Sequence, residues 1–355
     1  MTSDLTPTPE SPAALGYRMP AEWERHAATW LSWPHKEASW PGQLDSIPPI
    51  WAAIVRALVA GEDVAILVND AAPAAQVRAL LVRAGVPLDR VRLYEVPTDD
   101  AWIRDHGPIF VTRRTGSRAG LALVDWKYNA WGGKYPPWDR DDRVPLAVAQ
   151  LLGVDAFSPG IVLEGGSIDV DGQGTLLTTE ACLLNPNRNP QLGRGEIEQY
   201  LCDYLGVRRV LWLGEGIVGD DTDGHVDDLT RFVAPGVVVT VLEDNPRDEN
   251  HARLQDNYRR LQSMHDAHGR TLRIVSLPMP EPIFYDGTRL PASYANFYIG
   301  NAAVLMPVFG GRRDAEALAT LRSLFPGRQV VGINAVDLVW GLGAFHCVTQ
   351  QQPAL

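Results

Sequence analysis

Residues 223–242, DGHVDDLTRFVAPGVVVTVL, contain the unit that decides the fold. A polar cluster, DGHVDD, leads directly into short runs of β-branched and apolar residues that a Pro-Gly pair separates. Such runs, bounded by turn residues, predict strands. The segment is therefore expected to form a polar loop followed by a strand, a turn and a second strand.

The same unit recurs along the chain. Other polar loops that lead into apolar runs are WIRDHGPIFV from Trp102, LEGGSIDVDGQGTLLTT from Leu163, YANFYIGNAAVLMPVF from Tyr294 and AFHCVTQQ from Ala344. With one marker residue in each loop (Asp105, Glu164, His225, Asn296 and Cys347), the spacings are 59, 61, 71 and 51 residues. Five units of similar length favour a closed, radially repeated fold over two unrelated halves.

Helical patterns lie between these units. Residues 48–60, 74–84 and 249–268 repeat apolar side chains at steps of three and four, as an amphipathic helix does. Alternating strand pairs and helices predict a five-bladed α/β propeller with its helices outside. The loops before the inner strands would then converge on one cavity. We expect residues 1–16, rich in Pro, Ser and Thr, to form a flexible tail and residues 17–355 to form one catalytic domain.

Charge and composition exclude several classes of protein. The 32 Lys and Arg residues against 43 Asp and Glu residues give a net charge of −11. This balance argues against nucleic acid and anionic membrane surfaces as partners and suits a small cationic ligand. The chain lacks a run of about 18 apolar residues and an N-terminal signal pattern. Three cysteines without a CxxC pair indicate a reducing compartment, so we expect a cytoplasmic protein.

Two clusters carry candidate catalytic groups. Cys347 follows a glycine-containing loop, where a thiol can act as a nucleophile, although a lone cysteine is more often a buried apolar residue. His225 and Asp227 are two residues apart, so in a strand they would share a face, and a histidine beside a carboxylate suits general acid–base catalysis. Cys182 and Cys202 lack such a loop and are expected to be structural.

Metal sites fit the same segment poorly. With Gly224 at position six of a calcium loop, the two essential ligand positions would hold Gly219 and Thr230. No second histidine lies at zinc-ligand spacing from His225. We therefore expect neither a metal nor another cofactor.

Further acidic residues complete the pattern. Asp105 lies beside Trp102, and Glu164 lies in a glycine-rich turn. For Arg104, an internal ion pair is the preferred interpretation. Carboxylates on separate loops, one histidine, one cysteine and aromatic walls together suit a planar cation, because a guanidinium presents donors that carboxylates bind in pairs.

Several longer strings resemble one family over nearly the whole chain. They are RMPAEW, TWLSWPH, DDAWIRDHGP, NAWGG with YPPWDRDD, LEGGS, TTEACLLNPNRNP, DTDGHVD, ASYANFY and HCVTQQ, which together run from Arg18 to Gln351. With these motifs the chain resembles the agmatine deiminases, also called bacterial-type peptidylarginine deiminases, of the guanidino-group-modifying superfamily. The resemblance implies a five-bladed propeller and a cofactor-independent hydrolase.

The resemblance also implies roles for individual residues. It makes Cys347 the nucleophile, His225 the general acid–base, and Asp105 and Asp227 the carboxylates that bind the guanidinium. Glu164 would either orient His225 or contact the substrate. Trp102, Trp131, Asp99 and Asp221 are the candidates for lining the substrate cavity, and a homo-oligomer is a possible assembly.

Three departures from the family pattern concern the far end of the substrate. Ala344 stands where the family has Asn, Lys134 alone separates Gly133 from Tyr135, and Thr230–Arg231 replaces smaller or uncharged residues. Agmatine is the expected substrate. The alternatives are free or peptidyl arginine, or an inert propeller that only binds guanidino ligands or a protein partner.

Overall fold

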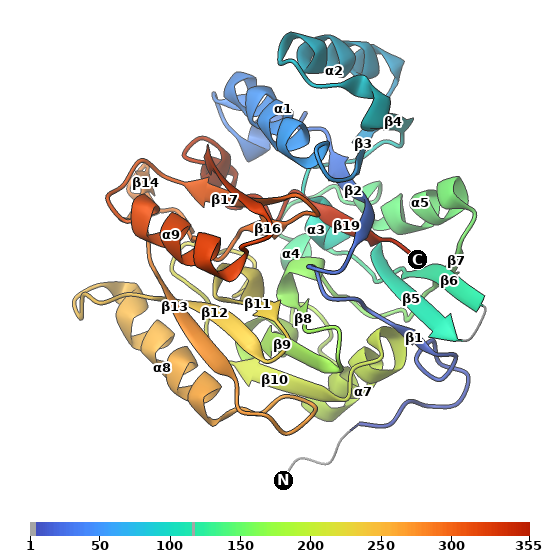
Figure 1. Cartoon of the computed structure of the whole chain (residues 1–355), viewed down its shortest axis with the longest axis vertical. Helices are drawn as coiled ribbons and strands as arrows, with labels where there is room; N and C mark the ends of the chain where they lie inside the picture. Colours follow the sequence, from blue (N-terminus) through green and yellow to red (C-terminus); the bar gives the residue numbers. More distant parts are fainter. Residues whose placement is uncertain (1–4, 116–117) are drawn as a thin grey trace.

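The computed structural model describes residues 5–115 and 118–355 (Figure 1). Within this part of the chain, five sheets repeat one order of elements: two antiparallel strands, then a helix, then a strand parallel to the second. The predicted alternation of strand pairs and helices is confirmed in these elements. A separate short hairpin consists of β14 (Phe284–Tyr285) and β15 (Thr288–Arg289).

Four of these repeats follow one another along the chain. The first contains β5 (Ile109–Thr115), β6 (Arg118–Val124), α5 (Val144–Leu152) and β7 (Asp155–Phe157), with β1 (Tyr17–Arg18) paired to β5. The second contains β8 (Asp169–Val170), β9 (Thr175–Thr179), α7 (Arg194–Leu205) and β10 (Arg209–Leu213). The third contains β11 (Thr230–Ala234), β12 (Val237–Leu242), α8 (Glu249–Ser263) and β13 (Arg273–Pro278). The fourth contains β16 (Tyr298–Ile299), β17 (Ala303–Val308), α9 (Asp314–Leu324) and β18 (Gln329–Asn334).

The fifth sheet joins both ends of the chain. Strand β19 (Gln350–Pro353) pairs antiparallel with β2 (His26–Ser32), with Gln350 opposite Trp30. It continues through α1 (Ile47–Leu58), β3 (Asp63–Val68), α2 (Ala71–Arg83) and β4 (Val91–Glu95). Figure 1 shows the red C-terminal strand beside the blue β2. A strand near the C-terminus therefore completes a sheet that begins near the N-terminus.

The helices follow the sequence pattern where it is strongest. Helix α1 begins with prolines in its first turn, where their missing N–H costs nothing, and buries Trp51, Ile54, Val55 and Leu58 on one face. This agrees with the prediction for residues 48–60. The expected helix over 249–268 is wrong at its C-terminal end, since α8 stops at Ser263.

The chain reverses beyond α8 instead of continuing the helix. His265 forms a bridge with Thr271, and the Asp266 carboxylate accepts hydrogen bonds from the backbone N–H groups of His268 and Arg270. An aspartate that binds nearby backbone donors stabilises a turn in competition with a helix. The three-and-four spacing over 249–268 therefore extends past the end of the helix into this turn.

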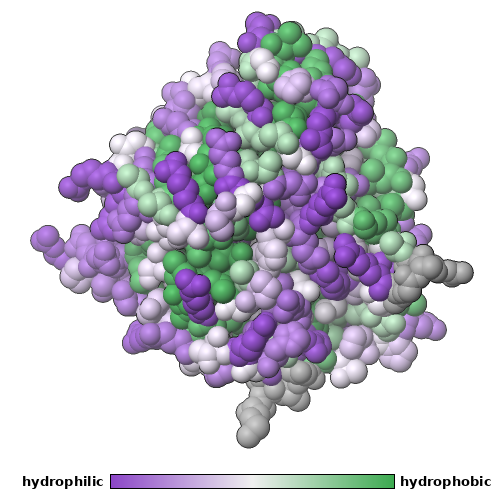
Figure 2. Space-filling model, in the orientation of Figure 1, coloured by the Kyte–Doolittle hydropathy of each residue, from purple (hydrophilic) through white to green (hydrophobic). Residues whose placement is uncertain are grey.

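The described part of the N-terminal segment, residues 5–16, makes hydrogen bonds with the second repeat. The N–H of Leu5 donates to the Arg208 carbonyl, and Thr8 donates to Asp203 in α7. The flexible tail over 1–16 stays a prediction. Among the helices of the described residues, none has the length and apolar character that a membrane span requires. In the view of Figure 2, polar residues cover much of the surface and apolar ones form separate patches.

Candidate active site

The five predicted loops meet at one place. Asp105 lies in α3 (Ile103–His106) before β5, and Glu164 directly precedes the short 3₁₀ turn Gly165–Ser167. His225 precedes the 3₁₀ turn Val226–Asp228 before β11. The distances between their groups are short: His225 Nδ1 to Asp105 Oδ1 is 3.7 Å, and His225 Nε2 to Glu164 Oε2 is 3.9 Å. The predicted convergence of these loops is confirmed.

The fourth and fifth loops complete the cluster. Asn296, ahead of β16, donates through Nδ2 to the Cys347 Sγ at 3.2 Å. The same Sγ lies 3.8 Å from Oδ2 of Asp227. Cys347 itself is buried, with 6% of its surface exposed. Residues from all five repeats therefore belong to one cluster of neighbouring groups that includes the thiol.

Gly166 allows these groups to approach each other. Its N–H donates to Asp105 Oδ1 at 2.9 Å. A Cβ at this position would lie 2.6 Å from His225 Nδ1, 2.8 Å from Asp105 Oδ1 and 3.0 Å from Asp227 Oδ2. These are contacts that real Cβ atoms do not tolerate, so the LEGGS string needs glycine here because of space.

Asp105 is held by two donors. Besides Gly166, the indole Nε1 of Trp131 donates to its Oδ2 at 3.0 Å. Trp131 lies in α4 (Ala130–Gly133) with φ 56° and ψ 41°, a left-handed conformation that turns the NAWGG string back on itself. Burial raises the pKa of Asp105 to about 6, against the opposing effect of His225. This carboxylate is therefore ionised only above mildly acidic pH.

His225 carries a positive charge in this setting. Neither ring nitrogen has a hydrogen-bond partner among the described residues, and the side chain is buried. Burial alone would lower its pKa, but Asp105, Cys182 and Glu164 outweigh this effect and hold the pKa well above its usual range. The ring therefore has a proton to donate at neutral pH.

Glu164 is fixed beside His225. Its Oε1 accepts a hydrogen bond of 2.6 Å from Nε of Arg188, a buried arginine that also contacts Asp223 and the carbonyl of Thr222. Burial would raise the pKa of Glu164, yet Arg188 and His225 hold it below its ordinary value. Glu164, His225 and Asp227 are not among the residues that line the cavity, whereas Asp105 and Cys347 are. Of the two roles expected from the sequence, the place of Glu164 between Arg188 and His225 suits the orientation of His225.

The pKa of the Cys347 thiol is raised, and the pKa of the neighbouring Asp227 carboxylate is lowered. Burial, together with Asp227, Asp228 and Asp105, holds the pKa of Cys347 well above its ordinary value. For Asp227, burial is outweighed by His346, His225 and Arg231, which lower its pKa. Its Oδ1 has no partner among the described residues. The site therefore combines a protonated thiol with an ionised carboxylate that has one free oxygen.

A cavity of about 360 Å³ opens above these groups. Cys347 and Asp105 lie on its wall, and so do three of the four substrate-binding candidates: Trp102, Trp131 and Asp221. Asp99 is not among the lining residues; its carboxylate accepts the backbone N–H of Arg140 at 2.9 Å. The next residue, Asp100, lines the cavity instead. Which of two adjacent carboxylates reaches the cavity depends on the path of the loop.

The departures from the family pattern have different positions. The Lys134 ammonium donates hydrogen bonds to the Asp221 carbonyl and to the Asp223 carboxylate. The next residue, Tyr135, lies on the cavity wall, and its hydroxyl donates to the Asp221 carboxylate. Arg231 is fully buried, and its Nε binds Asp169 at 2.9 Å, so it does not line the cavity. Ala344 is also buried and outside the lining. Of the three departures, the one at Lys134 is therefore the one that shapes the cavity.

One group of described side chains has ligand atoms close enough for a metal ion. The atoms belong to Glu164, Cys182 and His225 and lie within 4.8 Å of one another. The positive charge of Arg188 on Glu164 opposes a cation there. The absence of a metal stays a prediction.

Four residues of this site were not found from the sequence. Arg188 and Asn296 contact Glu164 and Cys347, and His346 binds Asp227. Glu22 binds His346 in turn. Asn296 had a signal, as the marker of its repeat, while Glu22 is separated from its partners by more than 80 residues and has no local pattern. The ion pair expected for Arg104 is confirmed, with Glu22 at 3.4 Å.

Comparisons with known proteins agree with this geometry. The model of the Porphyromonas-type peptidyl-arginine deiminase family matches residues 18–353. The agmatine deiminase of Ectopseudomonas mendocina is 41% identical, with 99% of each chain covered. The solved agmatine deiminase of Enterococcus faecalis is 37% identical, with a TM-score of 0.90 over 98% of this chain and 99% of that one.

A third relative carries a substitution of cysteine by serine. This C. jejuni agmatine deiminase, solved with substrate bound, is 28% identical, with a TM-score of 0.85 over 95% of this chain and 96% of that one. A family match across nearly the whole chain, together with relatives of such identity and coverage, establishes the family. The chain belongs to the Porphyromonas-type peptidyl-arginine deiminase family.

Proposed function

We propose that this protein is an agmatine deiminase, which hydrolyses the guanidinium of agmatine to N-carbamoylputrescine and ammonia. One observation carries the proposal: a buried thiol, Cys347, lies among carboxylates and a charged histidine at the wall of an acidic cavity. The relatives named agmatine deiminase support the same activity.

Two carboxylates bind the guanidinium. Asp227 offers its free Oδ1, and Asp105 is held by Gly166 and Trp131 in a fixed orientation. Carboxylates match the N–H donors of a guanidinium in pairs of hydrogen bonds. This places the central carbon against the Cys347 sulfur, and such positioning supplies a large share of catalysis.

Substrate binding activates the nucleophile. In the free protein, carboxylates and burial keep the Cys347 thiol protonated. A bound guanidinium cation offsets those negative charges and lowers the thiol pKa, so the proton leaves to solvent and a thiolate forms. The thiolate then attacks the guanidinium carbon, a C–S bond forms, and the C=N electron pair moves onto nitrogen.

His225 handles the protons of both half-reactions. The imidazolium protonates one nitrogen of the tetrahedral adduct, the C–N bond breaks, and ammonia leaves a covalent thiouronium on Cys347. Neutral His225 then takes a proton from water, whose oxygen attacks the same carbon. The C–S bond breaks, the proton of the new hydroxyl group goes to the departing sulfur, and the ureido product leaves the Cys347 thiol. Glu164, held by Arg188, stabilises His225 whenever the ring is an imidazolium.

The mouth of the cavity favours a substrate with a second positive charge. Its lining includes Asp100, Asp221 and Asp286. Lys36 is the cationic residue of the lining, and its Nζ lies 3.3 Å from Asp100. The carboxylate of free arginine would meet these acids with no unpaired cation to receive it. The ammonium of agmatine meets complementary charge.

The convergence of the five loops supports a propeller. We infer that the five repeated sheets are the blades of an α/β propeller over residues 17–355, with the converging loops at its centre.

The cysteines support a location for the protein. All three are free thiols, which suits a reducing compartment such as the cytoplasm.

A substrate comparison tests the proposed function. Ureido product is measured with agmatine, arginine and a blocked arginine peptide, for the unmodified protein and for Cys347→Ser. We expect agmatine to give the highest kcat/KM and Cys347→Ser to have no turnover. A preference for the peptide would overturn agmatine as the substrate, and no turnover with any of them would overturn deimination.

A further inference from the structure

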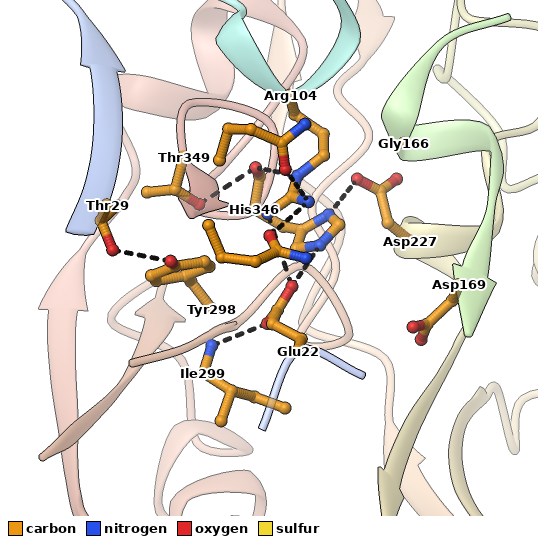
Figure 3. A network of polar contacts seen from close by, with 12 residues as sticks. Glu22, Thr29, Arg104, Gly166, Asp169, Asp227, Tyr298, Ile299, His346 and Thr349 are labelled. Atoms are coloured by element: carbon orange, nitrogen blue, oxygen red, sulfur yellow. Dashed lines mark hydrogen bonds and ion pairs between the residues drawn. The ribbon is translucent and has the colours of Figure 1, made fainter. Parts of the chain in front are cut away.

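The imidazole of His346 lies between two buried carboxylates (Figure 3). Its Nδ1 is 2.7 Å from Oδ2 of Asp227, and its Nε2 is 2.8 Å from Oε2 of Glu22. Ionised carboxylates only accept hydrogen bonds, so both ring nitrogens must carry a hydrogen. We propose that His346 is an imidazolium that donates from both ring nitrogens, and that Glu22 holds it in place to position Asp227 for the substrate guanidinium.

Glu22 is anchored as this role requires. Its Oε1 accepts the backbone N–H of Ile299 at 2.7 Å. Its Oε2 also meets Nη2 of Arg231 at 2.9 Å and Nη2 of Arg104 at 3.4 Å. Burial would raise the pKa of Glu22, but Arg231, His346 and Arg104 hold it far below its ordinary value. Glu22 therefore remains an anion and keeps the second proton on His346.

The charges around this chain of contacts balance. The acidic groups are Glu22, Asp169 and Asp227, and the cationic ones are Arg104, Arg231 and His346. On its other side, Asp227 faces His225 together with the acids Asp105 and Asp228. Loss of the charge on His346 would leave these acids in excess, and the pKa of Asp227 would rise.

His346 also positions the nucleophile. It directly precedes Cys347, and its backbone N–H donates to Oδ1 of Asn296 at 3.0 Å. The Nδ2 of the same Asn296 donates to the Cys347 sulfur. One residue therefore links the carboxylate that binds the guanidinium to the loop that carries the thiol.

The protonation state of His346 can be measured in the unmodified protein. ¹⁵N NMR of the histidine-labelled protein distinguishes a ring with two protonated nitrogens from a neutral ring. The His346 signal is assigned by its absence in His346→Asn. We expect the signal of a ring with two protonated nitrogens at pH 7.5. A ring with one unprotonated nitrogen at pH 7.5 would overturn the proposal.

Kinetics test the positioning role, which rests on the proposed deiminase activity. Glu22→Gln keeps the shape of the side chain and removes its charge. At pH 7.5 we expect KM for agmatine to rise by roughly tenfold and kcat to change less, because Asp227 loses the charged partner that holds it for the guanidinium. The acid limb of kcat/KM should stay near pH 6, since Asp105 sets it and the pKa of Asp227 is lower. His346→Asn, which keeps a donor near Asp227 without the charge, should raise KM in the same way.

Glu62→Gln is the matched control. Glu62 is another buried glutamate, and its Oε1 lies 3.0 Å from Nδ1 of His26. The other ring nitrogen of His26 binds the backbone carbonyl of Glu22, so Glu62→Gln removes a charge close to Glu22 without removing a partner of the His346 ring. We expect this variant to lose stability with KM for agmatine unchanged. An unchanged KM in both Glu22→Gln and His346→Asn would overturn the inference, whereas no turnover by the unmodified protein would overturn the proposed function and leave the NMR result as the test of His346.

Discussion

The indole Nε1 of Trp131 donates a hydrogen bond of 3.0 Å to Oδ2 of Asp105. The bond joins an aromatic wall of the cavity to a carboxylate whose pKa burial raises to about 6. A donor on the ionised form stabilises it, so the bond opposes that rise. Trp131 is thus part of the electrostatics of the site as well as of its wall.

Substitution of Trp131 by Phe removes this donor and keeps an aromatic ring. A hydrogen bond to a charged group contributes about 1.5–3 kcal/mol, so kcat/KM for agmatine should fall by roughly tenfold to a hundredfold. The acid limb of kcat/KM, set near pH 6 by Asp105, should move to higher pH. Trp30→Phe is the control, because its indole binds Gln352 in β19 instead. An unshifted limb in Trp131→Phe would refute this assignment.

Replacement of Gly166 by Ala should abolish activity. The added Cβ would lie 2.6 Å from His225 Nδ1 and 2.8 Å from Asp105 Oδ1, so these catalytic groups must shift from their places. We expect kcat to fall by at least about a hundredfold, since displacement of catalytic groups by about 1 Å costs that much. Gly195→Ala in α7, where a Cβ meets nothing within 4 Å, should retain full activity. Comparable rates for the two variants would contradict the crowding argument.

Removal of the Arg188 charge should lower the free energy of unfolding of the protein. Arg188→Met leaves Glu164 buried without its cation, a loss that costs about 3–5 kcal/mol of unfolding free energy in buried pairs. The pKa of Glu164 is lower in the folded protein than in the unfolded chain. Its ionised form therefore stabilises the folded protein fully above the unfolded-state pKa, and this stabilisation is lost as the pH falls through the folded-state pKa. In urea unfolding, the loss of free energy caused by Arg188→Met should therefore be larger at pH 7.5 than at pH 4. Arg194→Met, at an exposed pair with Glu180, is expected to cost less than about 1 kcal/mol.

The raised pKa of Cys347 predicts slow alkylation of the free protein. The reactive form is the thiolate, so the rate with iodoacetamide should still increase with pH at pH 9, without a plateau near neutrality. Asp228→Asn removes one of the charges that raise this pKa and should shift the rate profile to lower pH. Cys347→Ser identifies the fraction of labelling that belongs to Cys182 and Cys202. A plateau below pH 8 would show that the free protein already holds a thiolate.

Asp221→Asn tests the far end of the substrate. Asp221 lines the cavity and accepts a hydrogen bond from Tyr135, so it is placed to meet the ammonium of agmatine. KM for agmatine should rise about tenfold, while kcat/KM for propylguanidine, which lacks the amine, should change little. The comparison substrate separates charge recognition from general damage. Asp256→Asn on the exposed face of α8 is the control. A loss of the same size for both substrates would remove Asp221 from amine recognition.

The sequence predicted the repeats because each one starts with a polar loop and apolar runs, a pattern that a short stretch of sequence contains. It also predicted that Asp105, Glu164, His225 and Cys347 would lie close together, since equivalent loops of a repeated fold face the same place. It could not predict Glu22 or His346 as partners, because their contact joins the two ends of the chain. The choice between Asp99 and Asp100 depended on loop geometry that a single sequence does not contain.

The pairing of β19 with β2 has a consequence for the order of assembly. Cys347 lies three residues before a strand that pairs with one more than 300 residues earlier in the sequence. This sheet forms only when these two distant segments meet, whereas the strands of each of the other repeats except β1 lie close together in the sequence. The segment that carries the thiol is therefore fixed by a long-range contact that the four sequential repeats cannot replace.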